Sequence, residues 1–378
     1  MNRQVKSTID DNEFIHLANP GKENSLYQSE LEAILKDVLT GGHYILGDKV
    51  KLFEENFANY CLAEHCISTA SGTDALIIAL KALGCGVNDK VITAPNAGYY
   101  STAAIRSIGA VPVYVDICQQ TMALSVPSLE FVLKSTKDIK CIIATHLFGA
   151  VIDIVEIAQL ASDYNVLLLE DCSQAHGAVY KGKVAGTFGD VGAYSFYPTK
   201  NLGALGDGGA IITNSQKVYD HALMLRQYGW SQKYNVVLPG GLNSRMDEIQ
   251  AAVLNFKLGK LNELNSRRKQ IVSRYASTPF NHIEVFNIEE SNFVAHLAIV
   301  KTDHRKKLKK FLFNNNIGCD IHFPILDYKQ EANFLPHVSC KNAEYLVERI
   351  LTIPCHPTMT EQELSFVIDK LKEFDKSI

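Results

Sequence analysis

The chain has 378 residues, of which 47% are hydrophobic and 21% charged, and a formal net charge of −4. This length predicts one large and one smaller domain, and the charge argues against a general surface for nucleic acid or membranes. Its 12 histidines and nine cysteines include no CxxC pair or compact cluster, which argues against a structural metal site. The polar start, residues 1–14, and the absence of a long apolar run predict a cytoplasmic protein without a signal peptide or membrane helix.

Residues 71–84, SGTDALIIALKALG, combine a small-residue turn with the pattern of an amphipathic helix. Ser71 or Thr73 would be its N-cap. The backbone N–H groups of Gly72 and Thr73 would then face an anion such as a phosphate. A helix cap without a ligand is the simpler interpretation of this segment taken alone.

Apolar runs of strand length follow, and a helical pattern over 155–165 separates two of them. The runs cover residues 91–96, 111–117, 141–149 and 166–171, with further strands expected at 191–196 and 208–213. Continuous apolar runs suit a sheet that is covered on both faces. The alternation predicts an α/β fold with a mostly parallel sheet.

The run 166–171 ends in two acids, Glu170 and Asp171. A carboxylate that terminates a buried strand needs a partner, and a pyridinium nitrogen is one. Asp171 is the candidate for that role, and Glu170 is the less favoured choice.

The tract SFYPTKNLGALGDGG, residues 195–209, places Lys200 in a turn-prone segment after Pro198. The four glycines that follow are expected to let the backbone approach a ligand closely. Pyridoxal phosphate (PLP) needs a lysine that forms an imine, a carboxylate for its pyridine nitrogen, and phosphate donors at a helix start. Lys200 and Asp171, with Gly72, Thr73 and the Ser195 hydroxyl for the phosphate, predict a PLP site.

A long, increasingly charged helical stretch from Asp247 to about Tyr275 is expected to connect the two domains. We expect a large domain over 14–260 and a small α+β domain over 261–378, with a strand at 294–301 and a final helix after Thr360. The basic helical segment 304–316 predicts a solvated helix face, because its apolar residues can face inward.

Several motifs resemble those of the DegT/DnrJ/EryC1/StrS family of PLP-dependent nucleotide-sugar aminotransferases, from about residue 15 to about residue 370. They are YILGDKVKLFEENFANYC (44–61), SGTDAL (71–76), THLFG (145–149), LLEDCSQAHGA (168–178), the tract 195–209, and GLNSRMDEIQAA (241–252). The resemblance implies the aspartate-aminotransferase-like fold (fold type I). It also implies that Lys200 holds PLP as an imine, with pyridoxamine phosphate as an intermediate.

The same resemblance assigns further residues. Gln174 would contact the ring hydroxyl, and Asn243 would reach across a homodimer to the cofactor phosphate of the partner subunit. His322, in IHFP (321–324), would approach the sugar nucleotide. Arg245 is a candidate for the substrate's diphosphate, because a guanidinium recognises phosphate oxygens in bidentate fashion. A salt bridge to a neighbouring acid, Asp247 or Glu248, is the alternative for Arg245.

One position departs from the family pattern. Gly98, in PNAGYY, stands where the family usually has an aromatic residue that stacks on the cofactor. Tyr99 or Tyr100 would supply the ring if the loop shifts, and packing at the domain edge is the alternative for both. His146 and His176 lie near predicted strand ends but receive no catalytic role.

The resemblance implies an aminotransferase that converts a nucleotide-linked keto sugar with glutamate as donor. The tract 200–209, IHFP, Asp327 and Gln330 are most similar to members that act on a dTDP-3-keto-6-deoxyhexose. A C-4 aminotransferase and a non-catalytic regulatory protein that binds PLP or sugar are the alternatives. A dehydratase subgroup replaces the lysine with histidine, so Lys200 argues against that activity.

Overall fold

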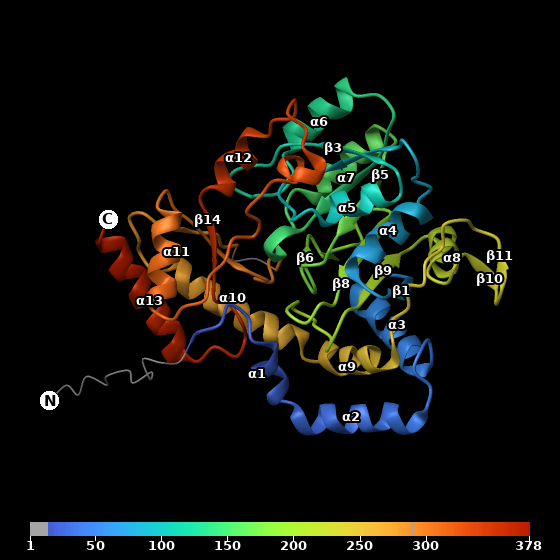
Figure 1. The fold of residues 1–378 in the computed structure, drawn as a ribbon, viewed down its shortest axis with the longest axis horizontal. Coiled ribbons are helices and arrows are strands. Elements are labelled where there is room, and N and C mark those ends of the chain that lie inside the picture. Colours follow the sequence, from blue (N-terminus) through green and yellow to red (C-terminus); the bar gives the residue numbers. More distant parts are fainter. Residues whose placement is uncertain (1–13, 289–290) are drawn as a thin grey trace.

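The computed structural model describes residues 14–288 and 291–378 (Figure 1). Residues 1–13, which include most of the polar start used for the localisation prediction, lie outside this part. A large sheet with helices on both faces lies at one end of the molecule, and a smaller sheet with its own helices lies at the other. Within the described residues, we find no helix with the length and apolar character needed to span a membrane.

The large sheet has seven strands in the order β1-β9-β8-β5-β4-β2-β3. Every strand runs in one direction except β9, which is antiparallel to β1 and β8. The prediction of a mostly parallel sheet is therefore confirmed. The strands are β1 (His65–Thr69), β2 (Lys90–Thr93), β3 (Val111–Tyr114), β4 (Ile139–Thr145), β5 (Leu167–Asp171), β8 (Val191–Ser195) and β9 (Gly209–Thr213). Of these, β1 was missed by the sequence analysis.

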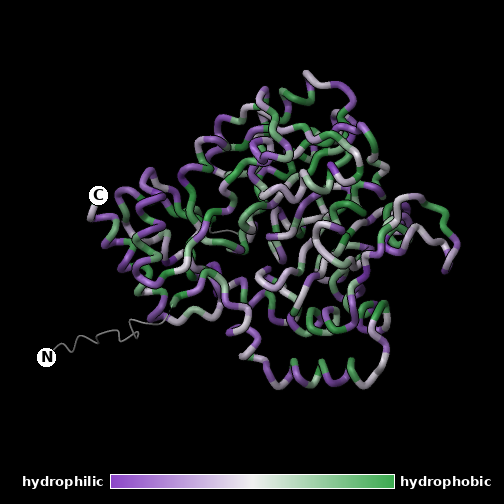
Figure 2. Tube along the Cα trace, viewed as in Figure 1, coloured by the Kyte–Doolittle hydropathy of each residue, from purple (hydrophilic) through white to green (hydrophobic). Residues whose placement is uncertain are grey.

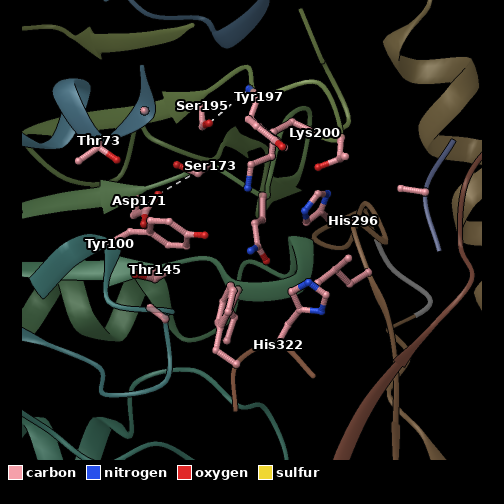
Figure 3. Close-up of a pocket in the computed structure, with 18 of the residues that line it drawn as sticks. Thr73, Tyr100, Thr145, Asp171, Ser173, Ser195, Tyr197, Lys200, His296 and His322 are labelled. Atoms are coloured by element: carbon pink, nitrogen blue, oxygen red, sulfur yellow. Dashed lines mark hydrogen bonds between the residues drawn. The ribbon is translucent and has the colours of Figure 1, made fainter. Parts of the chain in front are cut away.

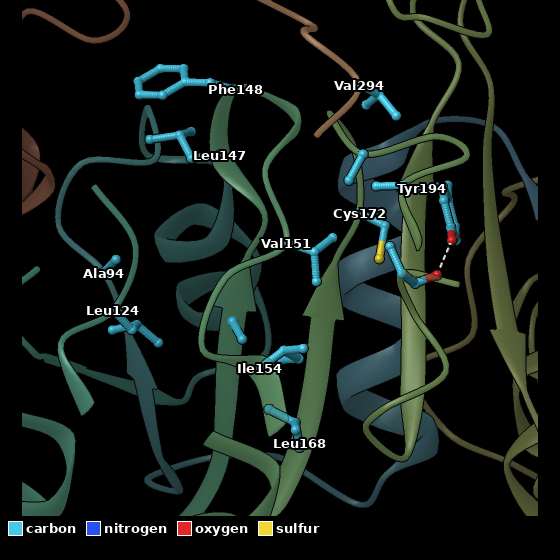
Figure 4. Packing of buried hydrophobic residues seen from close by; sticks show 14 of the residues in the cluster. Ala94, Leu124, Leu147, Phe148, Val151, Ile154, Leu168, Cys172, Tyr194 and Val294 are labelled. Atoms are coloured by element: carbon cyan, nitrogen blue, oxygen red, sulfur yellow. Dashed lines mark hydrogen bonds between the residues drawn. The ribbon is translucent and has the colours of Figure 1, made fainter. Parts of the chain in front are cut away.

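Both faces of this sheet are apolar, which explains the continuous hydrophobic runs. Ile142 and Leu168 pack in a cluster on one face, whereas their neighbours Ile143 and Leu169 pack in a second cluster on the other. Figure 4 shows part of the first cluster, where the Tyr194 hydroxyl also donates a hydrogen bond to the Ala185 carbonyl. The hydrophobic segments run through the centre of the molecule in Figure 2.

Helices cover the sheet and extend beyond it. They are α1 (Pro20–Ser25), α2 (Gln28–Gly41), α3 (Asp48–Cys61), α4 (Gly72–Ala82), α5 (Tyr100–Ser107), α6 (Val126–Ser135), α7 (Ile154–Asp163), α8 (Gln216–Leu225) and α9 (Glu248–Leu258). Short two-stranded pairs add β6 (Val179–Tyr180) with β7 (Lys183–Val184), and β10 (Trp230–Gln232) with β11 (Asn235–Val236).

The prediction of one helical stretch from Asp247 to about Tyr275 is wrong in one respect. It consists of two helices, α9 and α10 (Leu261–Ala276), and the break falls at Gly259 and Lys260. Glycine is a poor helix former, and the charge periodicity of the sequence did not reveal this break. Figure 1 shows α10 leading from the large sheet to the smaller one, as the connector was expected to do.

The smaller sheet is antiparallel and contains β12 (Glu284–Val285), β13 (Ala298–Lys301) and β14 (Ile350–Ile353), with helices α11 (Arg305–Asn314) and α13 (Glu361–Lys376) nearby. Helix α12 (Lys341–Val347) precedes β14 but packs in the core of the large sheet. Leu308 and Leu312 of α11 are buried, whereas Lys306, Lys307 and Lys310 are exposed, so its basic face is solvated as expected.

The described chain does not divide strictly in sequence order. Ile15 packs in the core of the smaller sheet, and Leu326 packs in the core of the large one. The domain boundary at residue 260 therefore stays a prediction.

Candidate active site

A cavity of about 530 Å³ opens where several strands of the large sheet end. Thr145, Asp171 and Ser195, the last residues of β4, β5 and β8, all line it. Ligands of open α/β sheets bind at this edge. The cavity brings together most of the predicted site residues, namely Gly72, Thr73, Asp171, Gln174, Ser195, Lys200 and His322.

Lys200 lies in the middle of the pocket. Figure 3 shows Thr73 and Ser195 on one side, His296 and His322 on the other, and the Lys200 side chain between them. Burial lowers the pKa of Lys200 from 10.5 to about 8, although the nearby Asp171 carboxylate acts in the opposite direction. An amine with this pKa is about half unprotonated near pH 8. A much larger fraction of Lys200 than of an ordinary lysine can therefore act as a nucleophile or a base.

Asp171 is 4% exposed, and one of its carboxylate oxygens accepts a hydrogen bond from the Ser173 backbone N–H at 3.1 Å. Glu170 does not line the pocket. Its carboxylate accepts hydrogen bonds from the backbone N–H groups of Gly186, Phe188 and Gly189 at 2.7 to 2.8 Å. Asp171 can therefore face a ligand in the pocket, whereas Glu170 is held by hydrogen bonds to the protein backbone.

The side opposite the histidines is suited to a phosphate. Ser71 is the N-cap of α4, and its hydroxyl accepts from the Asp74 N–H at 3.1 Å, so Thr73 lies inside the helix. A Cβ atom on Gly72 would overlap the Ser195 side chain, so only glycine allows β8 and the helix start to approach this closely. The N-terminus of a helix and two hydroxyls, those of Thr73 and Ser195, are suited to binding an anion here.

Two of the four glycines after Lys200 have a different role from the predicted one. A Cβ atom on Gly203 would overlap the Pro198 carbonyl, and one on Gly209 would overlap the Ser71 carbonyl. Neither glycine lines the pocket. These glycines let backbone segments pack against one another and not against a ligand.

Gln174 is fixed by one hydrogen bond. Its side-chain oxygen accepts from the Phe148 backbone N–H at 2.6 Å, which leaves its NH₂ group as a donor in the pocket wall. This arrangement fits the predicted contact with a ring hydroxyl.

His146 and His176 have structural environments. The His146 ring nitrogen Nε2 lies 2.8 Å from Glu170, and both residues are buried. His176 is fully buried between Tyr194 and Phe196, and burial, reinforced by the Lys200 charge, lowers the pKa of His176 to about 3. Neither histidine lines the pocket.

His146, Glu170 and Cys172 bring three potential metal-ligand atoms within 4.8 Å of one another. The Glu170 oxygens already accept several N–H donors, and burial raises the pKa of the Cys172 thiol well above its usual value. This chemistry suits a hydrogen-bonded core better than a metal ion.

Tyr100, and not Tyr99, lines the pocket, and Figure 3 shows its ring beside Asp171. Gly98 has a φ of +75°, and a Cβ atom there would lie 2.9 Å from the Phe323 ring. Phe323 also lines the pocket, and its ring centroid is 5.8 Å from that of Tyr100. Gly98 itself carries no ring, but the rings of Tyr100 and Phe323 both lie beside this position in the pocket.

His322 lies at the pocket wall and its Nδ1 is 2.8 Å from the Thr352 hydroxyl. Burial lowers the pKa of His322, and the Lys200 charge contributes to this. The pocket residues that the sequence analysis missed include His296 and Arg268. Both occur in segments that the sequence analysis treated only as secondary structure.

Asn243 and Arg245 do not line this pocket. Asn243 is exposed, whereas Arg245 is half-buried. No ion pair among the described residues joins Arg245 to Asp247 or Glu248. Asp247 is instead the N-cap of α9, and Glu248 accepts from the Gly47, Lys49 and Val50 backbone N–H groups. In one subunit both residues are thus separate from the Lys200 site.

A family model described as the DegT/DnrJ/EryC1/StrS aminotransferase family matches residues 26–372. The chain belongs to this family. This confirms the family resemblance and the enzyme class predicted from the sequence.

Similar proteins agree with the assignment to the DegT/DnrJ/EryC1/StrS family. A dTDP-3-amino-3,6-dideoxy-alpha-D-galactopyranose transaminase from Aneurinibacillus thermoaerophilus is 38% identical, and the match covers 93% of this chain and 97% of that protein. The crystal structure of S. venezuelae DesV in complex with a ketimine intermediate has a TM-score of 0.93 at 32% identity, covering 97% and 99% of the two chains. NtdA from Bacillus subtilis with bound cofactor PMP has a TM-score of 0.88 at 27% identity, covering 100% of this chain and 87% of NtdA.

The DegT/DnrJ/EryC1/StrS family uses PLP, and the pocket of this chain fits that cofactor. The start of α4 at Gly72 and Thr73, together with Ser195, forms a cradle that suits the cofactor phosphate, and we call it the Gly72 cradle. The Asp171 carboxylate suits a pyridinium, and the Lys200 amine suits an aldehyde. The fold prediction, an aspartate-aminotransferase-like α/β fold, is confirmed by the same structural neighbours.

Proposed function

We propose that this protein transfers the amino group of glutamate to the keto carbon of a dTDP-3-keto-6-deoxyhexose, acting in the cytoplasm as a homodimer. The observation that carries the proposal is the convergence of Lys200, Asp171 and the Gly72 cradle in one pocket of a chain of this family. Bound PLP would supply the electron sink that stabilises a carbanion at the reacting carbon.

Each residue then has one task. The Lys200 Nζ takes the proton from the α-carbon of the donor and, in the second half of the reaction, returns a proton on the sugar side. The Asp171 carboxylate keeps the pyridine nitrogen protonated. Gly72, Thr73 and Ser195 hold the phosphate, while the Gln174 NH₂ group donates to the ring hydroxyl.

The choice of a 3-keto sugar is supported by the name of the A. thermoaerophilus relative, a 3-amino-sugar transaminase. Asp327, one of the residues that suggested this choice, does not line the pocket. It is fully buried and accepts hydrogen bonds from the Tyr99 N–H at 2.9 Å and the Thr102 hydroxyl at 2.6 Å. Asp327 thereby holds the start of α5, and with it Tyr100, against the loop that follows Phe323.

The homodimer is supported by the position of Asn243. Its side chain is exposed on the surface of one subunit, where it is available to the site of a second subunit. Arg245 lies two residues further along the same segment. We therefore assign both residues to the partner's cofactor and substrate phosphates.

The test uses the purified protein with glutamate and two substrates, a dTDP-3-keto-6-deoxyhexose and its 4-keto isomer, with mass spectrometry of the products. We expect the 3-amino sugar and a much lower kcat/KM for the 4-keto isomer. A higher kcat/KM for the 4-keto isomer would establish the C-4 alternative. If neither sugar is aminated and glutamate leaves the cofactor absorption unchanged, the non-catalytic alternative is correct.

A further inference from the structure

Arg268 is a buried guanidinium in the wall of the Lys200 pocket. It comes from the middle of α10 and is 5% exposed. Its Nη1 donates to the Cys355 carbonyl at 2.6 Å, whereas its Nε has no acceptor among the described residues. The neighbouring Arg267, by contrast, pairs with Glu361 at 2.9 Å outside this pocket.

None of the ion pairs formed among the described residues involves Arg268. Asp171 and Asp207 are the acids that line the cavity, and neither is its partner. An arginine side chain stays protonated in a protein, and burying such a charge without a counter-charge is costly. Arg268 therefore presents a positive charge without a counter-charge at the pocket wall, where an anionic ligand would supply one.

His296 lies near Arg268 and its hydrogen bonds define its role. Asn201 donates through Nδ2 to Asn265 and Val294, so its oxygen must accept from the Nδ1–H of His296 at 2.8 Å. Burial, together with the Lys200 and Arg268 charges, holds the pKa of His296 well below its usual value. The neutral ring then presents Nε2 as an acceptor, and Arg268 is left as the anion-binding group.

Three kinds of anion enter the pocket in the proposed reaction. The cofactor phosphate has its own cradle at the start of α4. The diphosphate of the nucleotide sugar is assigned above to Arg245 across the dimer. A carboxylate on an aliphatic chain fits best, because the apolar side chains of Leu17, Leu297 and Ile353 line the same cavity.

We propose that Arg268 binds a carboxylate of the amino donor and so selects an amino dicarboxylate such as glutamate. A guanidinium matches the two oxygens of a carboxylate with two parallel N–H donors. The inference rests on the aminotransferase reaction proposed above and adds the subsite that recognises the donor.

The test measures binding of glutarate, a dicarboxylate without an amine, to the PLP-loaded enzyme by calorimetry. Arg268→Met should weaken glutarate binding by about 30-fold or more, as expected for loss of a buried charged partner. Arg268→Lys should weaken it less, because it keeps the charge but loses the planar fork. The matched control, Arg267→Met on the same helix, should bind glutarate within about twofold of wild type.

Steady-state kinetics give a second readout. In Arg268→Lys the KM for glutamate should rise, whereas the dissociation constant of the nucleotide sugar should not change. Unchanged glutarate affinity in Arg268→Met overturns the proposal, as does a loss confined to the nucleotide sugar. If Arg268→Met fails to fold, the same comparison with Arg268→Lys decides.

Failure of the proposed function has a different signature. A wild-type enzyme that binds glutarate through Arg268 but aminates no nucleotide-linked keto sugar would refute that function and leave the carboxylate site standing.

Discussion

Glu170 and Asp171 are consecutive residues of β5 whose carboxylates lie on opposite faces of the sheet, one within the scaffold and one in the pocket. Successive side chains of a β-strand point to opposite faces of the sheet, which produces this arrangement. The two neighbours therefore offer a matched pair of substitutions that separates chemistry from stability.

Asp171→Asn should lower kcat by several orders of magnitude while the protein stays folded, because an unprotonated pyridine is a poor electron sink. Glu170→Ala should instead lower the stability by about 3 kcal/mol or more, since buried N–H donors lose their acceptor. Turnover assays and thermal melts of both variants check this. Near wild-type turnover in Asp171→Asn would refute the assigned pairing.

Lys200 should react faster than the other lysines in cofactor-free protein near pH 8. With a pKa of about 8 it is about half unprotonated there, whereas an ordinary lysine is almost fully protonated. Limited labelling with an amine-selective reagent and peptide mapping should show an excess on the order of 100-fold. In the loaded enzyme, borohydride should fix the cofactor to this same residue.

Lys200→Ala should abolish turnover and hold PLP only non-covalently, with the fold intact. Dialysis should then release the cofactor from the variant but not from wild type. Borohydride labelling of a different lysine in wild type would show that the assignment is wrong.

Mixing subunits of two impaired variants tests the shared site. Lys200→Ala and Asn243→Ala homodimers should each be impaired, but hybrids contain one site with both residues intact. Random exchange makes half of the dimers hybrids, so about a quarter of the wild-type activity should return. A monomer that stays fully active at high dilution would rule out the homodimer.

The sequence predicted which residues gather in the pocket for much of the site, because short contiguous motifs contain them. The Ser71 cap, the Asp171 strand end and the Lys200 turn are local features, and each lies where expected. Arg268 and His296 were missed since each occurs in an otherwise ordinary pattern. Only the tertiary fold brings α10 and the segment before β13 to the pocket.

Two local predictions failed for physical reasons. The sequence showed that the glycines after Lys200 permit close approach, but not that the approaching atoms belong to Pro198 and Ser71. Likewise, a single glycine within a helical pattern does not always end a helix, so Gly259 did not by itself predict the break between α9 and α10.

Asp327 should make stability depend on pH. Burial raises the pKa of this carboxyl from 3.8 to about 7, against the hydrogen bonds from Thr102 and Tyr99. The folded protein then binds more protons than the unfolded chain between about pH 4 and pH 7, so its stability falls as pH rises through that range.

We therefore expect the difference in melting temperature, wild type minus Asp327→Asn, to decrease as the pH rises from 5 to 8. Asp369→Asn, at an exposed position of α13, is the control and should show no such trend. A difference that is constant over this range would show that Asp327 does not titrate there.

Leu17 and Ala18 line the same cavity as Cys355, although more than 300 residues separate them in the chain. Ile15 holds this early segment in place through backbone hydrogen bonds with Asn316 and Gly318 at 2.8 Å. During synthesis on the ribosome, the cavity wall stays incomplete until nearly the whole chain has emerged. Capture of the cofactor in a closed site is thus a late event in biogenesis, and chains that stop early lack it.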